Sequence, residues 1–275
     1  MGSSGPFRGP NLPSALCIAV LIALAGLLSL PAGAAAGDAV VQRASVSPTR
    51  GFVDSAEGVR VEFRLAGTSP ADVTIAVSGS SGRVRTIDVP GVEPGADRTA
   101  RWDGLSDGGR LVPDGTYRIA VTVAGGSRRD AGTVELHRNL FPVRGPHGTR
   151  GPVGEFNAPR DGGRRHKGFD VTARCGTPLA AAVSGTVTQR AYDRRLDGNF
   201  IVIKQLGAPR QYLYAHLIHP SPFQEGDFVH VGQIVGHVGR TGNARTVGCH
   251  LHFELHLHGR PINPAPYLRA WDRFS

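Results

Sequence analysis

Short runs in which apolar and polar residues alternate set the strongest constraint on the fold of this 275-residue chain. Successive side chains of a β-strand point to opposite faces, so alternation predicts strands with one buried face. Such runs lie at residues 59–65, 73–77 and 117–123. Turn-forming clusters of glycine, proline, serine and aspartate separate them, and no amphipathic helical stretch of useful length intervenes. We therefore predict that residues 38–138 form an all-β domain with the pattern of a β-sandwich.

The second half of the chain has the same character. Glycine-rich turns separate further candidate strands at residues 186–191, 199–204, 211–216, 234–238 and 250–257. The high content of glycine (38 residues) and proline (20 residues) favours turns and short strands over long helices. We predict a mostly antiparallel β domain over residues 166–275, with residues 139–165 as a linker and as the entry to that domain.

The first 36 residues have the pattern of an export signal. Arg8 is the only charge ahead of an apolar stretch at residues 15–30, and small residues follow at positions 31–36. That stretch is shorter than the ~20 apolar residues of a spanning helix, and no basic cluster follows it. We predict cleavage near Ala36, a secreted or wall-associated protein, and no stable membrane insertion after cleavage. Cys17 lacks the sequence context of a lipidation site.

The formal net charge is +9, and arginine supplies nearly all of the positive charge. A basic chain suits an acidic polymer, and nucleic acids, anionic lipids and wall polymers such as teichoic acids are all acidic. The arginines are scattered and are not interleaved with aromatic residues. We therefore predict no nucleic-acid partner and keep acidic wall polymers as candidates.

Residues 100–117 carry the run WDG…DG…VPDGTY, in which Trp102 is suited to fill a core and the Asp-Gly pairs are suited to turns. This run resembles the immunoglobulin-like domain of FlgD hook-capping proteins. Asp103, Asp107 and Asp114 are the candidates for a calcium site. Turns capped by these aspartates are the better interpretation, because aspartate and glycine are standard turn residues.

Three short segments carry histidines in a chemically suggestive order: residues 166–170 (HKGFD), 214–217 (YAHL) and 250–254 (HLHFE). Positions i and i+2 of a strand share a face, so His250 and His252 are expected to present two imidazoles to one cleft. Two nitrogens and one carboxylate oxygen, with a fourth place left to water, form the arrangement of a catalytic zinc site.

Together with glycine-rich fragments between residues 176 and 244, these segments resemble the zinc peptidases of the lysostaphin and LytM type, family twenty-three of the metallopeptidases. The resemblance implies one zinc ion held by His166, Asp170 and His252. It implies His216 and His250 as the catalytic pair. One of the pair would deprotonate water and pass a proton to the leaving amine, and the other would stabilise the oxyanion; the assignment stays open.

Further residues near this set have weaker signals. Asn199 and Thr241 match positions near the substrate groove of the family, as supporting residues. Glu254 has two interpretations, a carboxylate that orients a ligand imidazole or a surface group at a strand end. His256 and His258 share the parity of the HxH pair, and we expect them to be exposed beyond the metal.

Cys175 follows Asp170 closely and Cys249 directly precedes His250, so segments that hold one metal would bring the two thiols near each other. An even number of cysteines in an exported protein suggests a disulfide. We predict this bridge, which would close a loop of 249 − 175 = 74 residues. Free buried thiols and a cysteine-ligated metal are the alternatives.

The resemblance implies a zinc metalloendopeptidase that hydrolyses stem peptides or cross-bridges of bacterial peptidoglycan. A second hypothesis is a non-catalytic, wall-binding regulator of other wall hydrolases, and a third is a wall-binding adhesin. The presence of all five metal-binding and catalytic residues favours the enzyme.

Overall fold

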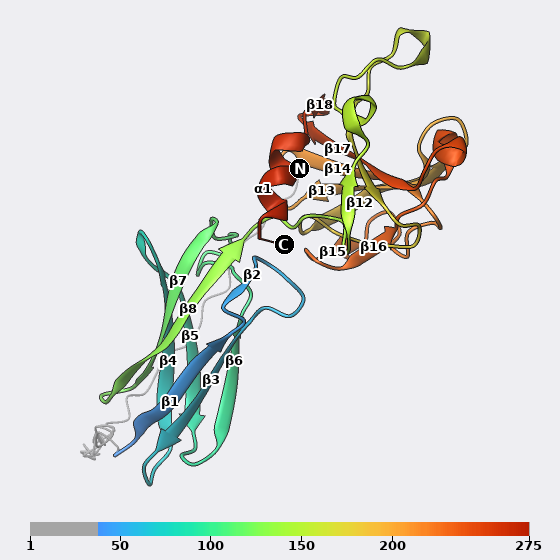
Figure 1. Ribbon diagram of the computed structural model, residues 1–275. Coiled ribbons are helices and arrows are strands. Elements are labelled where there is room, and N and C mark those ends of the chain that lie inside the picture. The colour runs from blue at the N-terminus through green and yellow to red at the C-terminus, as the bar shows by residue number, and fades with distance from the viewer. Residues whose placement is uncertain (1–37, 275) are drawn as a thin grey trace, which may run out of the picture. The chain divides into compact units, whose positions relative to one another are not determined.

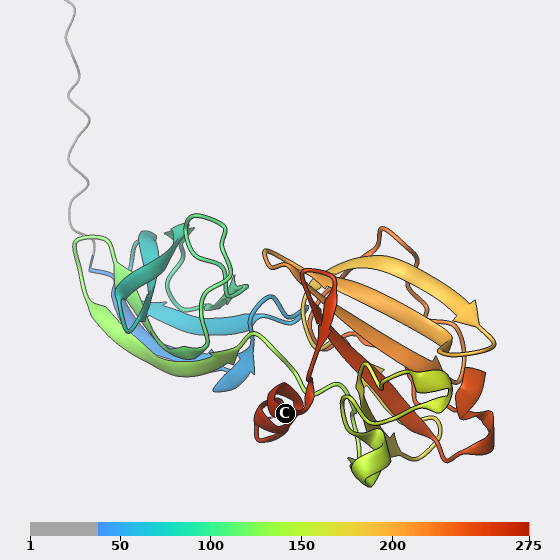
Figure 2. The ribbon, with the colours of Figure 1, turned by 90° about the horizontal axis from the view of Figure 1, so that it is seen from above.

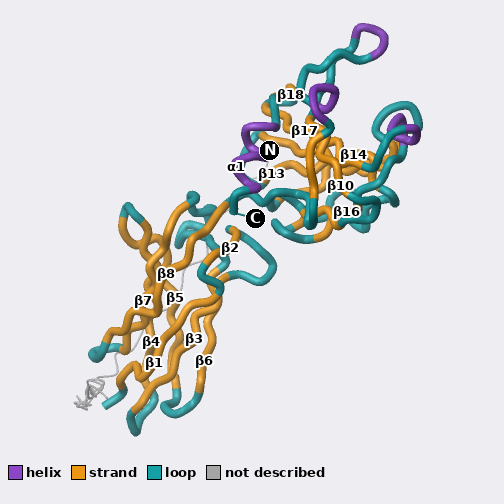
Figure 3. Tube along the Cα trace, in the orientation of Figure 1, coloured by secondary structure: helices purple, strands orange, loops and turns teal. Residues whose placement is uncertain are grey.

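The computed structural model describes residues 38–274, and strands dominate this range (Figures 1 and 3). Its helices are α1 (Ala265–Asp272) and three single-turn 3₁₀ helices, η1 (Gly151–Gly154), η2 (Asp161–Gly163) and η3 (Gly242–Thr246). The prediction of an all-β fold is confirmed. The predicted signal peptide, residues 1–36, lies outside the described residues. Within residues 38–274, no helix has the length and apolar character needed to cross a membrane.

The N-terminal part forms two sheets. A three-stranded sheet has the order β1–β3–β6, and a five-stranded sheet has the order β2–β8–β7–β4–β5, antiparallel except for the parallel pair β2 and β8. The strands are β1 (Val40–Ser47), β2 (Arg50–Phe52), β3 (Val59–Ala66), β4 (Ala71–Gly79), β5 (Gly82–Val92), β6 (Asp97–Trp102), β7 (Gly115–Val123) and β8 (Arg128–His137).

The predicted alternation decides which residues fill the core of this sandwich. Every second side chain of β3, from Val59 to Leu65, is buried, and the residues between them are not. Trp102 is 1% exposed, donates its Nε1–H to the carbonyl of Leu105 (2.8 Å), and packs edge-on against Tyr117. A large aromatic ring whose polar atom is satisfied stabilises a core without a desolvation penalty.

The aspartates of the candidate calcium site serve as backbone acceptors instead. Asp103, Asp107 and Asp114 accept the N–H groups of Leu105, Thr86 and Arg138, respectively, at 2.8–2.9 Å. These bonds support the turn interpretation.

The C-terminal part is built around an eight-stranded sheet, whose strands differ in length. Its order is β15–β12–β13–β14–β17–β10–β9, with β18 on β17, and β11 and β16 form a separate pair. In Figures 1 and 2 the long orange and red strands run side by side as one curved sheet. The strands are β9 (His147–Thr149), β10 (Phe169–Ala173), β11 (Pro178–Ala180), β12 (Gly185–Asp193), β13 (Gly198–Gln205), β14 (Arg210–Leu217), β15 (Phe228–Val229), β16 (Ile234–His237), β17 (His250–Leu257) and β18 (Arg260–Ile262).

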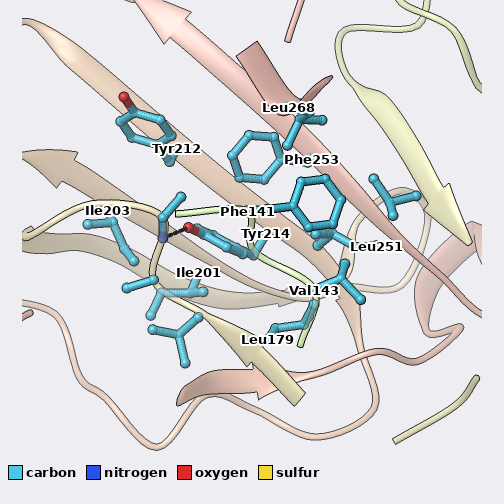
Figure 4. Packing of buried hydrophobic residues seen from close by; sticks show 14 of the residues in the cluster. Phe141, Val143, Leu179, Ile201, Ile203, Tyr212, Tyr214, Leu251, Phe253 and Leu268 are labelled. Atoms are coloured by element: carbon cyan, nitrogen blue, oxygen red, sulfur yellow. Dashed lines mark hydrogen bonds between the residues drawn. The ribbon is translucent and has the colours of Figure 1, made fainter. Parts of the chain in front are cut away.

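One face of this sheet is covered by a second hydrophobic cluster. Figure 4 shows Leu251 and Phe253 of β17 packed beside Tyr214, whose hydroxyl accepts the N–H of Ala182 at 2.6 Å. Phe141 and Val143 belong to the same cluster, and β9 pairs with β10. Much of the predicted linker is therefore part of the C-terminal structure, because its apolar side chains complete that core.

A disulfide joins Cys175, just beyond β10, to Cys249, just before β17, with the two Cα atoms 5.4 Å apart. It closes a loop that contains β11–β16. The crosslink therefore ties together the ends of two strands that are hydrogen-bonded neighbours.

We expect the double substitution Cys175→Ser and Cys249→Ser to lower the free energy of unfolding by up to about 4 kcal/mol, because the unfolded chain gains loop entropy. The chain has two tryptophans, one in each cluster, so a Trp102→Phe background leaves Trp271 as reporter of the C-terminal core. Denaturation followed by Trp271 fluorescence measures the change. The matched reporter, Trp102 in a Trp271→Phe background, should show an unchanged midpoint; equal shifts at both reporters would contradict the prediction.

Candidate metal centre

Strand register brings the first candidate ligands together. Asp170 of β10 and His252 of β17 are direct cross-strand partners, and His252 is also the partner of Ala215 in β14. Paired residues project to the same face, so the Asp170 and His252 side chains meet. His166 precedes β10 and is held by backbone bonds to Asn157 and Ala158, which direct its ring to the same point.

Three ligand atoms converge on one position. His166 Nε2 lies 2.8 Å from His252 Nδ1, and each nitrogen lies 3.0 Å from Asp170 Oδ1. All three side chains are buried. Tetrahedral ligand atoms at about 2.0–2.2 Å from zinc are about 3.3 Å apart, which is close to the spacing of these three atoms.

The other ring nitrogen of each imidazole is held by a hydrogen bond, which leaves these two nitrogens facing the metal position. His166 donates its Nδ1–H to the carbonyl of Glu155 (2.8 Å), and His252 donates its Nε2–H to Glu254 Oε1 (3.0 Å). With those nitrogens protonated, neutral imidazoles leave His166 Nε2 and His252 Nδ1 unprotonated. Two imidazole nitrogens and one carboxylate oxygen then converge at a buried position. This donor set suits a divalent cation.

The electrostatics of the site agree with this fit. Burial alone lowers the pKa of His252, but hydrogen bonds to Asp170 and Glu254 outweigh it and raise the pKa to about 9. Burial raises the pKa of Asp170, but the hydrogen bonds of His166 and His252 hold it far below its ordinary value. Without a metal, the second proton on the His252 imidazole is the positive charge that these side chains stabilise, and a bound divalent cation would replace it.

Two arginines that the sequence analysis did not single out contact the second oxygen of Asp170. Arg150 Nη1 lies 3.1 Å and Arg160 Nη2 3.7 Å from Oδ2. These contacts fix the rotation of the carboxylate and leave Oδ1 for the metal position. Both arginines lie in the predicted linker, where nothing in the local pattern separates them from the other arginines.

Glu254 lies between two imidazoles. Its Oε1 accepts from His252, and its Oε2 lies 2.5 Å from His256 Nε2. Of the two interpretations of Glu254, this geometry supports the one in which it orients a ligand imidazole. The expectation that His256 is exposed is wrong: its side chain is 21% exposed, because the Glu254 contact holds it against the sheet. His258 is exposed in the turn after β17.

His216 reaches the same face through an irregularity of β14. Simple alternation would direct His216 to the core face, with Tyr214. Instead, one residue of β13 between Asn199 and Ile201 opposes two residues of β14, and His216 has φ 62°, in the left-handed region. Such a bulge re-aims a side chain. The His216 ring centroid consequently lies 4.9 Å from that of His250 and 5.7 Å from that of His252.

In both His216 and His250 a backbone carbonyl holds Nδ1, and His250 Nε2 lies 3.9 Å from Asp170 Oδ2. His216 donates its Nδ1–H to the carbonyl of Thr241, and His250 donates its Nδ1–H to the carbonyl of Gly248, each at 2.9 Å. Burial, with the nearby His252 and His250, lowers the pKa of His216 to about 3. Burial also lowers the pKa of His250. Two neutral imidazoles therefore stand beside the metal position as proton acceptors.

Asn199 and Thr241 support the backbone next to His216. The Thr241 hydroxyl (2.9 Å) and the Asn199 side-chain amide (3.2 Å) both donate to the carbonyl of Leu217, and the Asn199 N–H donates to Thr241 Oγ1 (2.9 Å). Their contacts hold the bulge and do not reach the metal position.

Both parts of the chain match models of known protein families. Residues 164–264 match the model of peptidase family M23, and residues 50–127 match that of the FlgD Ig-like domain. The C-terminal part of the chain is thus similar to peptidase family M23. The proposed metal ligands and the two candidate catalytic histidines all fall within the range that matches the M23 model, namely His166, Asp170, His216, His250 and His252.

Several curated relatives of this part of the chain carry peptidase names. The DD-carboxypeptidase/endopeptidase Mpg of Neisseria meningitidis is 37% identical over 37% of this chain and 22% of its own length. The L-Ala–D-Glu endopeptidase of Bacillus subtilis is 31% identical over 52% of this chain and 47% of its own length. The catalytic domain of lysostaphin from Staphylococcus simulans is 27% identical, with 45% of this chain and 92% of that one covered and a TM-score of 0.39. This chain thus spans less than half the length of either curated relative.

We expect Glu254→Gln to weaken binding of a divalent metal about 10–100-fold, because the amide no longer fixes the charge and tautomer of His252. Competition against a chromogenic chelator measures the affinity. His258→Gln is the matched control, since His258 is exposed on the same strand end and should leave the affinity unchanged. Equal affinities for the wild type and Glu254→Gln would contradict this role.

Proposed function

We propose that this protein is a zinc metalloendopeptidase that hydrolyses peptide bonds of bacterial peptidoglycan, in the stem peptide or the cross-bridge. The observation that carries the proposal is the meeting of three buried ligand atoms, from His166, Asp170 and His252, beside the imidazoles of His216 and His250. The endopeptidase names of its M23 relatives support the substrate class.

We propose a single zinc ion, held by His166, Asp170 and His252. A set of two imidazole nitrogens and one carboxylate oxygen suits zinc and leaves a place for water or substrate. The ion, when bound, supplies Lewis acidity toward water and the scissile carbonyl.

We also propose the domain boundaries. They are a sandwich at 38–138, an entry segment at 139–165 and a peptidase domain at 166–275. Two separate hydrophobic clusters support the division into two domains, and Phe141 and Val143 group the entry segment with the second one.

The protein's own groups account for the proton transfers. A neutral Nε2 of His216 or His250 accepts a proton from the attacking water, whose oxygen adds to the scissile carbonyl carbon. The carbon–nitrogen bond then breaks, and the imidazolium returns the proton to the departing amine nitrogen. The other imidazole lies where it can stabilise the oxyanion. The Thr241 and Gly248 carbonyls fix the tautomer that makes these transfers feasible.

The alternative function is that of a non-catalytic, wall-binding regulator of other hydrolases. A regulator has no need of two aligned Nε2 lone pairs beside a metal position, or of a left-handed backbone at His216. The strained backbone at His216 therefore favours the enzyme over the regulator, because strain of this kind is typical of functional sites.

Two substitutions separate metal binding from catalysis. We expect His252→Ala to lose both the bound zinc and activity. His216→Ala should keep about one zinc per chain but lose at least about 100-fold in rate, the usual scale of acid–base catalysis. Activity is the release of new amino groups from isolated sacculi, sensitive to a chelator, and metal content is measured on the same samples. His219→Ala, at an exposed position, is the control. A zinc-loaded wild type that releases no amino groups would support the regulator.

We also propose export and residence in the cell wall. Removal of residues 1–36 should leave a mature N-terminus at Gly37, because small residues precede that bond. Mass determination of protein secreted from a bacterial host checks this, and an intact Met1 terminus on the secreted protein would contradict it.

Removal of residues 1–36 takes away Arg8, and the remaining net charge of 9 − 1 = +8 should favour retention on acidic wall polymers. Because salt screens charge, we expect protein bound to isolated walls to elute as salt rises from 0.05 to about 0.5 M, where the Debye length becomes a few ångströms. Retention that does not change with salt would contradict the electrostatic interpretation.

A further inference from the structure

A cavity of about 450 Å³ adjoins the two candidate catalytic histidines of the M23 domain. Its lining includes Tyr192 of β12, Ile218 after β14, and the stretch from Gly239 to Thr241, with Arg245 of η3. Neither the metal ligands nor the proton-transfer groups line it, so the proposed chemistry leaves this cavity without a role.

The wall of the cavity is directly bonded to both histidines. The carbonyl of Thr241 accepts the Nδ1–H of His216 (2.9 Å), and the carbonyl of Gly239 accepts the backbone N–H of His250 (3.2 Å). Gly239 packs so closely that an added Cβ would lie 2.6 Å from the carbonyl oxygen of His216. A group bound in the cavity would therefore lie beside the two imidazoles that take part in the proposed proton transfers.

Two exposed arginines line this cavity, Arg240 and Arg245. Within residues 38–274, neither has an ion pair or a side-chain hydrogen bond, whereas Arg150 and Arg160 near the metal position both contact Asp170. A guanidinium pairs best with a carboxylate, which it can bind through two parallel N–H donors. Unpaired arginines beside a reaction centre are thus complementary to a negatively charged substrate group.

The cavity also offers apolar contact. Tyr192 is 57% exposed and Ile218 is 37% exposed, although both are large apolar side chains. The disulfide-bonded Cys175 adds to the lining, and its bond to Cys249 fixes that wall next to His250. A rigid wall and exposed apolar groups beside unpaired charges are typical of a binding site for an amphipathic group.

We propose that this cavity is a substrate subsite for a peptide residue that carries a free carboxylate, which Arg240 and Arg245 bind while Tyr192 and Ile218 contact its aliphatic part. The inference rests on the proposed peptidase function and specifies its substrate as an acidic peptide. Arg240 and Arg245 are specificity-determining residues in this scheme and take no part in proton transfer.

The test compares one substrate with and without its charge. Peptidoglycan fragments solubilised with lysozyme are used as isolated, and after carbodiimide coupling to ammonia, which converts carboxylates to amides. We expect the zinc-loaded wild type to cleave the native fragments with a kcat/KM at least about tenfold higher than the amidated ones, the scale of one charge-assisted hydrogen bond. In R240Q/R245Q this ratio should fall to about 1, with little change for the amidated fragments.

The control removes the same charge elsewhere. Arg83 and Arg128 are exposed residues of the sandwich, and R83Q/R128Q should keep the wild-type ratio. A wild-type ratio near 1, a ratio retained in R240Q/R245Q, or an equal loss in R83Q/R128Q would overturn the subsite.

Binding distinguishes failure of the subsite from failure of the proposed function. If the wild type cleaves neither kind of fragment, the proposed function fails. Calorimetric titration of zinc-loaded His216→Ala with both kinds then tests the subsite alone. Tighter binding of native fragments that R240Q/R245Q abolishes in this background supports it, and equal affinities overturn it.

Discussion

The antiparallel pairing of β17 with β10 on one side and β14 on the other is the constraint on which the metal centre depends. It places Asp170 opposite His252, although the two are 82 residues apart in the chain. The same strand anchors itself in the core through Leu251, Phe253 and Leu255, which alternate with the histidines. A slip of one residue would bury the histidines in the apolar core and expose these side chains, so core packing and site geometry enforce a single register.

In each of the four imidazoles at this site, a hydrogen bond to one ring nitrogen fixes the orientation of the ring. Backbone carbonyls bind His166, His216 and His250, and the Glu254 carboxylate binds His252. The orientation of the His216 ring requires a left-handed backbone at this residue, a conformation that costs on the order of 1–3 kcal/mol in a non-glycine residue. The hydrogen bonds that Asn199 and Thr241 donate to the next carbonyl offset part of that cost.

Local pattern predicted the strands well, because alternation and turn residues act over a few positions. The runs at 59–65 and 250–257 lie within β3 and β17, respectively. Resemblance, and not alternation, pointed to His216, since alternation alone directs it to the core. The contacts of Arg150, Arg160 and His256 were missed, because each depends on a partner brought close by folding or on a side-chain rotamer.

The sequence by itself determined the all-β class, the turn chemistry of the aspartates, and the set of residues able to bind a metal and move protons. The first two follow from residue type and short-range spacing, and the last from the resemblance to a known family. Only the tertiary structure decided which lone pairs meet, which carboxylate oxygen is left for the metal, and which arginines remain unpaired. Hydrogen-bond geometry and charge pairing are set by atoms from distant segments within about 3 Å of each other, and no local pattern carries that information.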